Sequence, residues 1–298
     1  MTTNEVFSRL IIIGVGLLGG SIGLAARKNG VARTIIGVGR TEKTLAIASR
    51  NGIIDVAYQS FEAIPNLVGE FPTLVVVCTP VGEITRNVLG VIQHFGHSEQ
   101  LLITDVGSTK ENLVRAISDF RFIGSHPIAG SERSGPDAAD AELFRDRLTV
   151  LTPTQHHSQH NIHLLRQFWE MLGSRVIEMD AARHDEILAV TSHFPHILSV
   201  ILTRMLQADE QQLTGTGFAG MTRLAAGSPE VWCDILLDNN DHILNAFRRF
   251  ESQLHELTNA LQSKDAKTIE RLLREAQGRV GSGEWGMESG EWGVGSGE

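Results

Sequence analysis

The chain has 298 residues, of which 42% are hydrophobic and 20% charged, and its 26 Lys and Arg against 35 Asp and Glu give a formal net charge of −9. This is the composition of an ordinary globular protein, and the length predicts about two domains. Nucleic-acid binding draws on clustered Lys and Arg, and no such cluster occurs, so we expect no nucleic-acid partner.

The two cysteines, Cys78 and Cys233, lie far apart in the sequence. They suit neither a disulfide framework nor a thiolate metal site, and we expect no bound metal. Residues 1–9 do not combine a basic stretch with an apolar one, and no apolar run reaches 18 residues. We therefore expect a cytoplasmic protein that does not enter a membrane.

Short apolar runs rich in β-branched residues recur through the first half of the chain, separated by segments with helical periodicity. This alternation predicts right-handed βαβ units and a doubly wound, Rossmann-like parallel sheet in an α/β domain. Two later runs are expected at the edge of the same sheet. The predicted strands are 10–13, 34–38, 74–78, 101–104, 122–124, 148–151 and 175–178.

From residue 180 the strand signals vanish, and apolar residues recur three or four positions apart. We predict a dinucleotide-binding domain at 1–179 and a helical substrate and dimerisation domain at 180–277. About 100 residues of amphipathic helix have a poor surface-to-volume ratio, so we expect a homodimer formed through this half. Residues 278–298 contain eight glycines and repeat Ser-Gly-Glu-Trp-Gly, which predicts a disordered tail.

A glycine-rich turn directly follows the first predicted strand and opens a predicted helix. Glycines permit a tight turn and the close approach of a pyrophosphate, and the helix N-terminus offers N–H donors to the phosphates. We therefore predict a dinucleotide site, to which two residues after the strand at 74–78 also belong. The predicted cofactor-binding residues here are Gly14, Gly16, Leu17, Leu18, Gly19, Thr79 and Pro80.

The end of the second predicted strand bears on the choice between NAD and NADP. NAD sites usually place Asp or Glu there to accept a hydrogen bond from the ribose 2′-hydroxyl. In this chain the first carboxylate after the second predicted strand is that of Glu42. Arg40 can pair with a 2′-phosphate and Thr41 can donate to it. NADP is the predicted cofactor and NAD the alternative. The competing interpretation of Arg40 is a solvated residue at the start of a helix.

Polar motifs follow the later strands, at the edge where an α/β sheet binds its ligands. They read Asp-Val-Gly-Ser-Thr-Lys at 105–110 and Ser-His-Pro-Ile-Ala-Gly-Ser-Glu at 125–132, and the helical half adds Thr-Ser-His-Phe-Pro-His at 191–196 and Thr-Arg-Leu-Ala at 222–225. Together with the glycine motif, their order resembles the prephenate/arogenate dehydrogenase family of tyrosine biosynthesis. The resemblance covers about residues 8–275.

The resemblance implies an oxidative decarboxylation, in which hydride leaves C4 of a cyclohexadienol for the nicotinamide and CO2 leaves C1. It implies that His126 accepts the hydrogen bond or proton of the 4-hydroxyl, and that Ser108 hydrogen-bonds the same hydroxyl and orients the histidine. A neutral imidazole, with its pKa of about 6.5, suits this role. The resemblance also implies substrate-binding roles, which fall on Ser192, His196, Arg223 and Glu132, with Arg223 on a carboxylate.

One position departs from the family pattern. Family members often carry an acidic residue three positions before the carboxylate-binding arginine, where it forms an ionic gate with the glutamate that matches Glu132. This chain has Gly220 there. The gate is therefore expected to be incomplete.

The helical half also allows inferences from spacing alone. Ser192 and His196 are four apart and share a helix face, and Pro195 is expected to kink the helix. We expect His193 to be structural and Trp232 to lie in the core. The histidines between 156 and 163 are expected to form a solvated face rather than a metal site.

The substrate is expected to be a small molecule, either prephenate or arogenate. Arogenate carries an ammonium group, so its pocket should offer an acceptor, and His196 favours prephenate. A 2-hydroxyacid or imine reductase would keep the nucleotide motif without the paired histidine motifs. An NAD(P)-sensing binding module, the alternative of another class, would not need Ser108, His126 and Arg223 together.

Overall fold

The computed structural model describes residues 6–65, 72–96, 98–130 and 133–281. Contacts divide the chain into two compact units, Met1–Ile243 and Leu244–Glu298, which are taken separately below. The first unit contains every predicted site residue. The predicted domain boundary near residue 180 stays a prediction.

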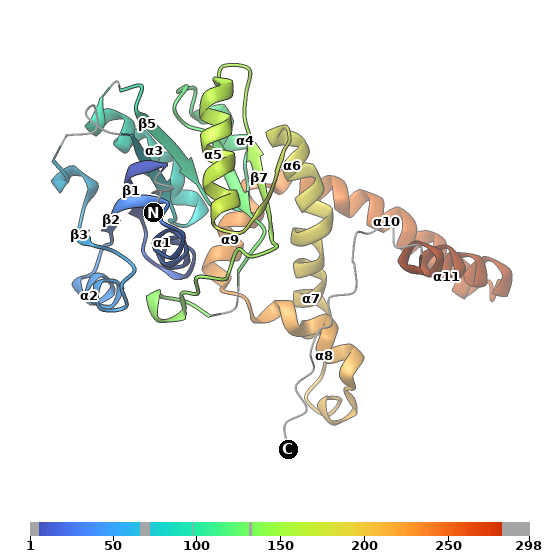
Figure 1. Cartoon of the computed structure of the whole chain (residues 1–298). Helices are drawn as coiled ribbons and strands as arrows, with labels where there is room; N and C mark the ends of the chain where they lie inside the picture. Colours follow the sequence, from blue (N-terminus) through green and yellow to red (C-terminus); the bar gives the residue numbers. More distant parts are fainter. Residues whose placement is uncertain (1–5, 66–71, 97, 131–132, 282–298) are drawn as a thin grey trace. The chain divides into compact units, whose positions relative to one another are not determined.

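The centre of the first unit is a five-stranded parallel sheet in the order β3-β2-β1-β4-β5 (Figure 1). This confirms the Rossmann-like α/β prediction. The carboxyl ends of β1 and β4, where the strand order reverses, are the expected ligand edge. The strands are β1 (Phe7–Ile13), β2 (Ala32–Val38), β3 (Val56–Tyr58), β4 (Thr73–Val77) and β5 (Leu101–Asp105).

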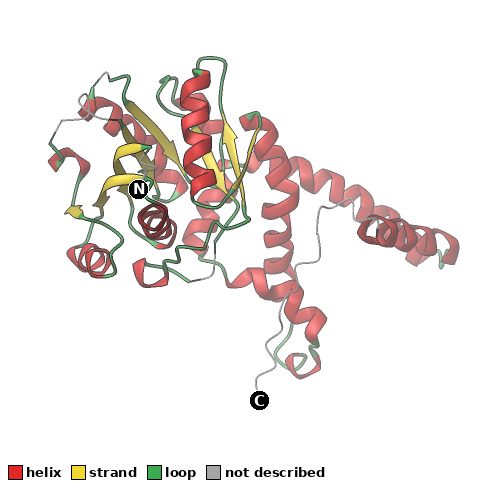
Figure 2. Cartoon of the chain, in the orientation of Figure 1, coloured by secondary structure: helices red, strands yellow, loops and turns green. Residues whose placement is uncertain are grey.

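Both faces of this sheet are covered by helices, as the uninterrupted apolar strands require (Figure 2). Leu10 and Ile12 belong to one buried cluster, and Ile11 and Ile13 to another. Alternate residues of β1 therefore face opposite sides of the sheet. The first cluster takes in α1 (Leu17–Asn29), α2 (Glu42–Arg50) and α5 (Gln159–Met171), and the second takes in α3 (Val81–Phe95) and α4 (Glu111–Ala116).

The prediction for the last strands is wrong in one respect, because they form a separate three-stranded sheet. In it, β6 (Gly124–Pro127) pairs antiparallel with β7 (Leu148–Thr152), which pairs parallel with β8 (Arg175–Glu178). The chain leaves the first sheet at Ser125, whose backbone N–H donates to the Asp105 carboxylate and whose hydroxyl donates to the Asp105 carbonyl. Before this point the chain pairs with β5 through a single parallel bridge between Ile103 and Phe122.

A helical segment follows β8 and ends the first unit. A π-helical turn, Ala189–His193, lies before Pro195, and the N–H of Phe194 donates to the carbonyl of Ala189. A proline removes a hydrogen bond and crowds the preceding turn, so the predicted kink takes this form. The helices of this segment are α6 (Ala181–Leu188), α7 (Phe194–Met205), α8 (Thr216–Thr222) and α9 (Pro229–Asp238). It also contains short 3₁₀ turns at Gln211–Leu213 and Arg223–Ala226. Earlier in the first unit, 3₁₀ turns lie at Phe61–Ala63 and Pro136–Ala138.

Among the described residues one helix, Ala181–Met205 counted through its π turn, has the length and apolar composition of a membrane span. It carries buried polar side chains, including His184 and Asp185, that bond to the α/β part of the first unit. Its first turns are therefore packed against the α/β part of the first unit.

The second unit contains most of α10 (Asn240–Gln262) and all of α11 (Ala266–Gly281). Asp265 caps α11 by accepting from the N–H groups of the next turn, and Arg271 on α11 pairs with Glu256 on α10 at 2.5 Å. Residues 278–281, predicted to be disordered, continue α11 as helix. The rest of the predicted tail, 282–298, lies outside the described residues.

Candidate active site

The turn between β1 and α1 requires glycine at two positions. Gly14 has φ of +98°, and a Cβ there would lie 2.6 Å from the carbonyl oxygen of Cys78 at the end of β4. A Cβ on Gly19 would lie 2.1 Å from the carbonyl oxygen of Gly14. No larger side chain fits either place. The glycines thus bring the turn against β4 and the first turn of α1 against β1.

The N-terminus of α1 is open. Gly16 is the N-cap residue, no side chain caps the helix, and a Cβ on Gly16 would meet no atom within 4 Å. Leu17 and Leu18 begin the helix and are half-buried. Backbone N–H groups at such an end need acceptors, and a phosphate supplies them. The turn therefore fits the pyrophosphate of a dinucleotide.

The other predicted nucleotide residues lie at the ends of β4 and β2. Thr79 accepts from the Asn87 amide at 3.0 Å, and Pro80 is the N-cap of α3. Thr41 caps α2 by accepting from the N–H of Thr44 at 3.2 Å. Arg40 is exposed, and in the part of the chain that the structure describes no hydrogen bond or ion pair engages it. Its guanidinium is available to a ligand.

A buried ion pair lies just after β5. Lys110 Nζ is 2.5 Å from Asp105 Oδ2, and both side chains are fully buried. The Asp105 carboxylate also accepts from the N–H groups of Gly107, at 2.7 Å, and Ser125, at 3.1 Å. Burial raises the pKa of Asp105, against the opposing effect of the Lys110 charge. Through these two backbone bonds, the Asp105 carboxylate links the loop that carries Ser108 to the strand that carries His126.

His126 lies on β6 and is 8% exposed. Its Nδ1 is 2.9 Å from Nε2 of His184 on α6, and Nδ1 of His184 is 2.7 Å from Oδ1 of Asp185. Burial, followed by the neighbouring His184, Lys110 and His193, lowers the pKa of His126 well below 6.5. His126 is therefore neutral near pH 7, as a general base must be.

Asp185 joins this histidine pair to α4. Its carboxylate accepts from the N–H of Lys110 at 2.8 and 3.1 Å and from that of Glu111 at 2.8 Å. Burial alone would raise the pKa of Asp185, but the bonds from His184 and these backbone groups outweigh it, and the pKa is lowered. Asp185 is a carboxylate at neutral pH.

Sequence reasoning missed His184 and Asp185. The family resemblance implied that Ser108 orients His126. In the structure the hydrogen bond of the His126 ring is to Nε2 of His184. Ser108 is half-buried in the loop after β5. The one signal in the sequence was an adjacent His-Asp pair at the start of a helix. Nothing in that pair pointed to a residue 58 positions away.

The helix that holds His184 also positions His193 and His196. His193 Nδ1 is 3.0 Å from the Asn239 amide nitrogen, and His196 stacks on Trp232 with ring centroids 3.5 Å apart and planes at 10°. Trp232 is half-buried and belongs to neither hydrophobic core cluster, so the prediction that it lies in the core is wrong. His193 Nε2 and His196 Nδ1 are buried and have no hydrogen-bond partner among the described residues. Such atoms are costly unless a ligand or water reaches them.

The remaining predicted substrate residues lie near this helix or outside the described residues. Arg223 is exposed in the 3₁₀ turn Arg223–Ala226, which is fixed to α7 by a bond from the N–H of Ala225 to the Ser199 hydroxyl at 2.9 Å. Ser192 is half-buried in the π turn. Glu132 lies outside the described residues, so the incomplete gate stays a prediction.

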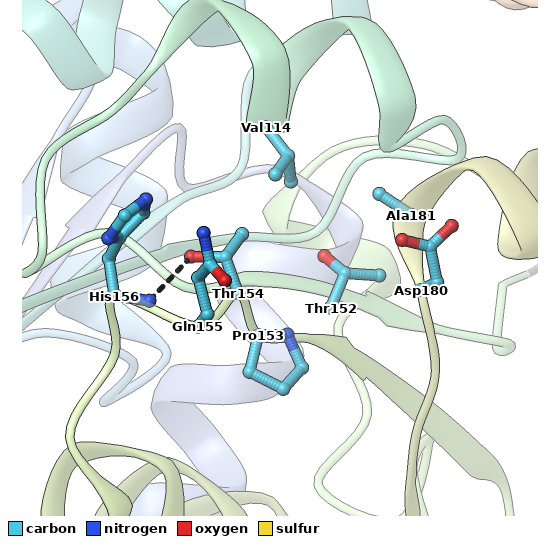
Figure 3. A pocket seen from close by; sticks show the side chains of 8 residues that line it. All are labelled: Val114, Thr152, Pro153, Thr154, Gln155, His156, Asp180 and Ala181. Atoms are coloured by element: carbon cyan, nitrogen blue, oxygen red, sulfur yellow. Dashed lines mark hydrogen bonds between the residues drawn. The ribbon is translucent and has the colours of Figure 1, made fainter.

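A cavity of about 410 Å³ lies apart from the predicted site residues (Figure 3). Its lining includes Asp180, whose carboxylate caps α6, and His156, whose N–H donates to the Thr154 hydroxyl at 3.4 Å. In the ranges that the structure describes, no three His, Cys, Asp or Glu side chains gather as a metal site would require.

Comparison with known proteins gives matches over most of the chain. The family model of the prephenate dehydrogenase nucleotide-binding domain matches residues 22–178, and that of the prephenate dehydrogenase dimerization domain matches 180–275. The chain is 34% identical over 285 residues to the prephenate dehydrogenase of Bacillus subtilis (strain 168), covering 92% of this chain and 76% of the relative. It is 31% identical over 283 residues to the cyclohexadienyl dehydrogenase of Zymomonas mobilis, covering 91% and 94%.

Solved structures agree with these matches. The prephenate dehydrogenase of Aquifex aeolicus, in complex with hydroxyphenyl propionate and NAD+, has a TM-score of 0.84 to this chain at 28% identity. The match covers 92% of this chain and 97% of the other.

Proposed function

The chain belongs to the prephenate dehydrogenase family of oxidoreductases, and we propose that it converts prephenate to 4-hydroxyphenylpyruvate in tyrosine biosynthesis, with NADP as the preferred hydride acceptor. The observation that carries the proposal is His126, a buried histidine held neutral and bonded through one ring nitrogen, in the same unit as a glycine turn that fits a dinucleotide.

In the proposed reaction His126 takes the proton of the substrate 4-hydroxyl. The O–H bond breaks and the C4 carbonyl forms as hydride leaves C4. The bond from C1 to its carboxyl group then breaks, CO2 leaves, and the electron pair of that bond makes the ring aromatic and the C4 oxygen a phenolate, which takes the proton back from His126. A nicotinamide dinucleotide held at the glycine turn of Gly14 and Gly16 would supply the acceptor for that hydride. Aromatisation supplies the driving force, so the protein has to hold the ring in place and polarise the hydroxyl.

The other predicted residues bind and orient the substrate. Ser108 donates to or accepts from the 4-hydroxyl, and Arg223 holds a carboxylate with its planar, bidentate guanidinium. Ser192 and His196 line the pocket, and the buried His196 Nδ1, which lacks a partner, supports this role. Glu132 is assigned to the same pocket.

Replacing His126 by Asn tests the chemistry. Asn cannot take up the proton, so turnover should fall by about 10²–10⁴-fold, the usual contribution of a general base. Cofactor affinity, measured by fluorescence titration, should not change. Full turnover by His126→Asn with both prephenate and arogenate would refute the mechanism, and a wild-type protein that binds cofactor but turns over neither compound would favour a sensing module.

Arogenate is the second candidate substrate. Prephenate carries a keto acid where arogenate carries an amino acid, and His196, buried and with its pKa lowered by burial, presents no fixed negative charge to an ammonium group. This favours prephenate. The ratio of kcat/KM for the two compounds, measured with the same enzyme and cofactor, decides between them.

The NADP preference depends on Arg40, which is exposed and free to pair with a 2′-phosphate. Replacing Arg40 by Asp should reverse the ratio of kcat/KM for NADP and NAD, because the carboxylate repels the phosphate and accepts from a ribose hydroxyl. Exposed Arg33, replaced in the same way, is the charge-matched control. An unchanged ratio in Arg40→Asp would refute the assignment.

We also propose a cytoplasmic homodimer formed through the helical half. The match of residues 180–275 to a dimerization domain supports it, as do large apolar side chains left exposed on α10 and α11. They include Leu244, Leu254, Leu261 and Leu273. A monomeric mass in light scattering at micromolar concentration would refute the dimer.

A further inference from the structure

The direction of the hydrogen bonds between His126, His184 and Asp185 follows from what each end can do. Asp185 is ionised, so it can only accept, and it already accepts from the backbone N–H groups of Lys110 and Glu111. The ring atom that lies 2.7 Å from its Oδ1 is Nδ1 of His184. This nitrogen must therefore carry a proton and donate it.

The protonation of His184 then sets that of His126. A neutral imidazole has one N–H and one bare nitrogen, so a proton on Nδ1 of His184 leaves its Nε2 bare. Nδ1 of His126, 2.9 Å away, must supply the proton for this bond. A neutral His126 with its proton on Nδ1 has a bare Nε2, which is the nitrogen left for a substrate hydroxyl.

We propose that His184 and Asp185 are positioning residues that hold His126 in the tautomer with a bare Nε2. The inference deepens the proposed function and rests on it where it concerns catalysis. The tautomer itself is a property of the protein before any substrate binds. A carboxylate at the far end of a histidine chain selects one tautomer in the same way wherever a buried histidine acts as a base.

The arrangement also prepares the site for the protonated base. When the substrate proton moves to Nε2 of His126, the O–H bond breaks, an N–H bond forms, and the imidazolium keeps its Nδ1 bond to His184. Asp185 supplies the negative charge on the far side of the pair. No proton has to travel along the chain for the charges to balance.

Other charged or titratable groups near His126 do not provide this orientation. Lys110 Nζ is bonded to the Asp105 carboxylate and to the carbonyl of Thr109. His193 Nδ1 is bonded to the Asn239 amide. Lys110 and His193 act on the charge of His126 from a distance, and the partner in the hydrogen bond of its ring is His184.

The tautomer can be measured without any turnover. Nitrogen-15 spectra of protein labelled in its 12 histidines distinguish a proton on Nδ1 from one on Nε2, and the signals lost in His126→Asn identify His126. We expect the Nδ1–H form in the wild type and a mixture of both forms in His184→Phe. A wild-type His126 with its proton on Nε2 would overturn the proposal, whatever the enzyme's substrate is.

Kinetics then tests whether the tautomer matters. His184→Phe should lower kcat by about 10–100-fold, part of the full contribution of a general base, with the KM for cofactor unchanged. His184→Gln, which restores an acceptor oxygen, should recover most of kcat and the Nδ1–H signal. If His184→Phe keeps full kcat, or if Gln rescues neither readout, the positioning role is wrong.

The chain offers a matched control for Asp185. Asp180 also caps a helix with its carboxylate, accepting from the N–H groups of Ala182 and Arg183, but no histidine in the described part of the chain is bonded to it. Asp185→Asn should lower kcat and disturb the His126 signal, and Asp180→Asn should change neither. Equal losses in the two variants would mean that Asp185 acts only as a helix cap.

Discussion

Removing the charge of Lys110 tests how the loop after β5 is held. In Lys110→Met, the Asp105 carboxylate stays fully buried and loses a cation 2.5 Å away. The N–H groups of Gly107 and Ser125 still donate to it, so the carboxylate is not stripped of all partners. The cost comes from the unbalanced charge, because the methionine fills a similar volume.

Breaking one side of a buried ion pair costs about 3–5 kcal/mol. Against a total stability of about 5–15 kcal/mol this is a large fraction. A second change, Asp105→Asn, removes the stranded charge and keeps an acceptor for the backbone N–H groups. The double variant should recover most of the loss, because replacing both partners of a buried pair is often close to neutral.

The loss should also depend on pH. Burial raises the pKa of Asp105, and Lys110 opposes this shift, so Lys110→Met raises the pKa further. A folded-state pKa above the unfolded value means that the folded protein binds more protons. The variant is then least destabilised at low pH and loses stability as the pH rises toward the folded pKa.

Urea unfolding at a fixed protein concentration measures these effects for the two single variants and the double variant. Lys28→Met is the matched control, since it removes the same side chain from an exposed pair with Glu142 and should barely move the midpoint. If Lys110→Met is no less stable than Lys28→Met, or if Asp105→Asn restores nothing, the argument from the buried charge is wrong.

Two further predictions concern the nucleotide turn and acid stability. Gly14→Ala should abolish cofactor binding in a fluorescence titration, because φ is +98° at this position and the added Cβ would lie 2.6 Å from the carbonyl oxygen of Cys78. Gly30→Ala is the control: its φ is also positive, but the added Cβ would meet open space. This variant should bind cofactor normally and lose about 1 kcal/mol of stability. Burial lowers the pKa of His193 to about 4, so folding stability should be full above pH 6.5 and fall by roughly 3 kcal/mol as the pH drops to about 4. His193→Asn cannot be protonated, and an unfolding midpoint that depends on pH as strongly as in the wild type would contradict this.

The parallel sheet could be predicted because its strands are buried on both faces and so read as unbroken apolar runs. The strand β3 was missed, since it is three residues long, lies at the sheet edge and buries none of them fully. The separate sheet was missed for another reason. At the place where the chain leaves β5, Ser125 is bonded to the carboxylate and the carbonyl of Asp105, and a hydrophobic pattern does not record such bonds.

The glycine turn could be predicted because its whole motif lies in six consecutive residues, Gly14 to Gly19, directly between one strand and one helix. The partner of His126 could not, because His184 is brought to it by tertiary packing across 58 positions. The same holds for Trp232, whose ring on α9 stacks on His196 of α7, 36 positions away in the sequence. The family resemblance identified His196 as a candidate, and spacing placed it on one helix face with Ser192, but neither predicted what would stack on it.

The burial that keeps His126 neutral, and so able to act as a base, also lowers the stability of the folded protein in acid. Burial keeps His126 neutral when the active site holds no substrate, because burial lowers its pKa. Burial also lowers the pKa of His193, on the helical segment that carries His184. Both residues must gain protons when the chain unfolds in acid, so each draws the equilibrium toward the unfolded state as the pH falls. Asp185, whose pKa is lowered, adds to this trend once the pH approaches its unfolded value. A variant that exposes His126 to water should therefore resist acid better and, because its imidazole is charged over more of the pH range, lose activity earlier as the pH is lowered.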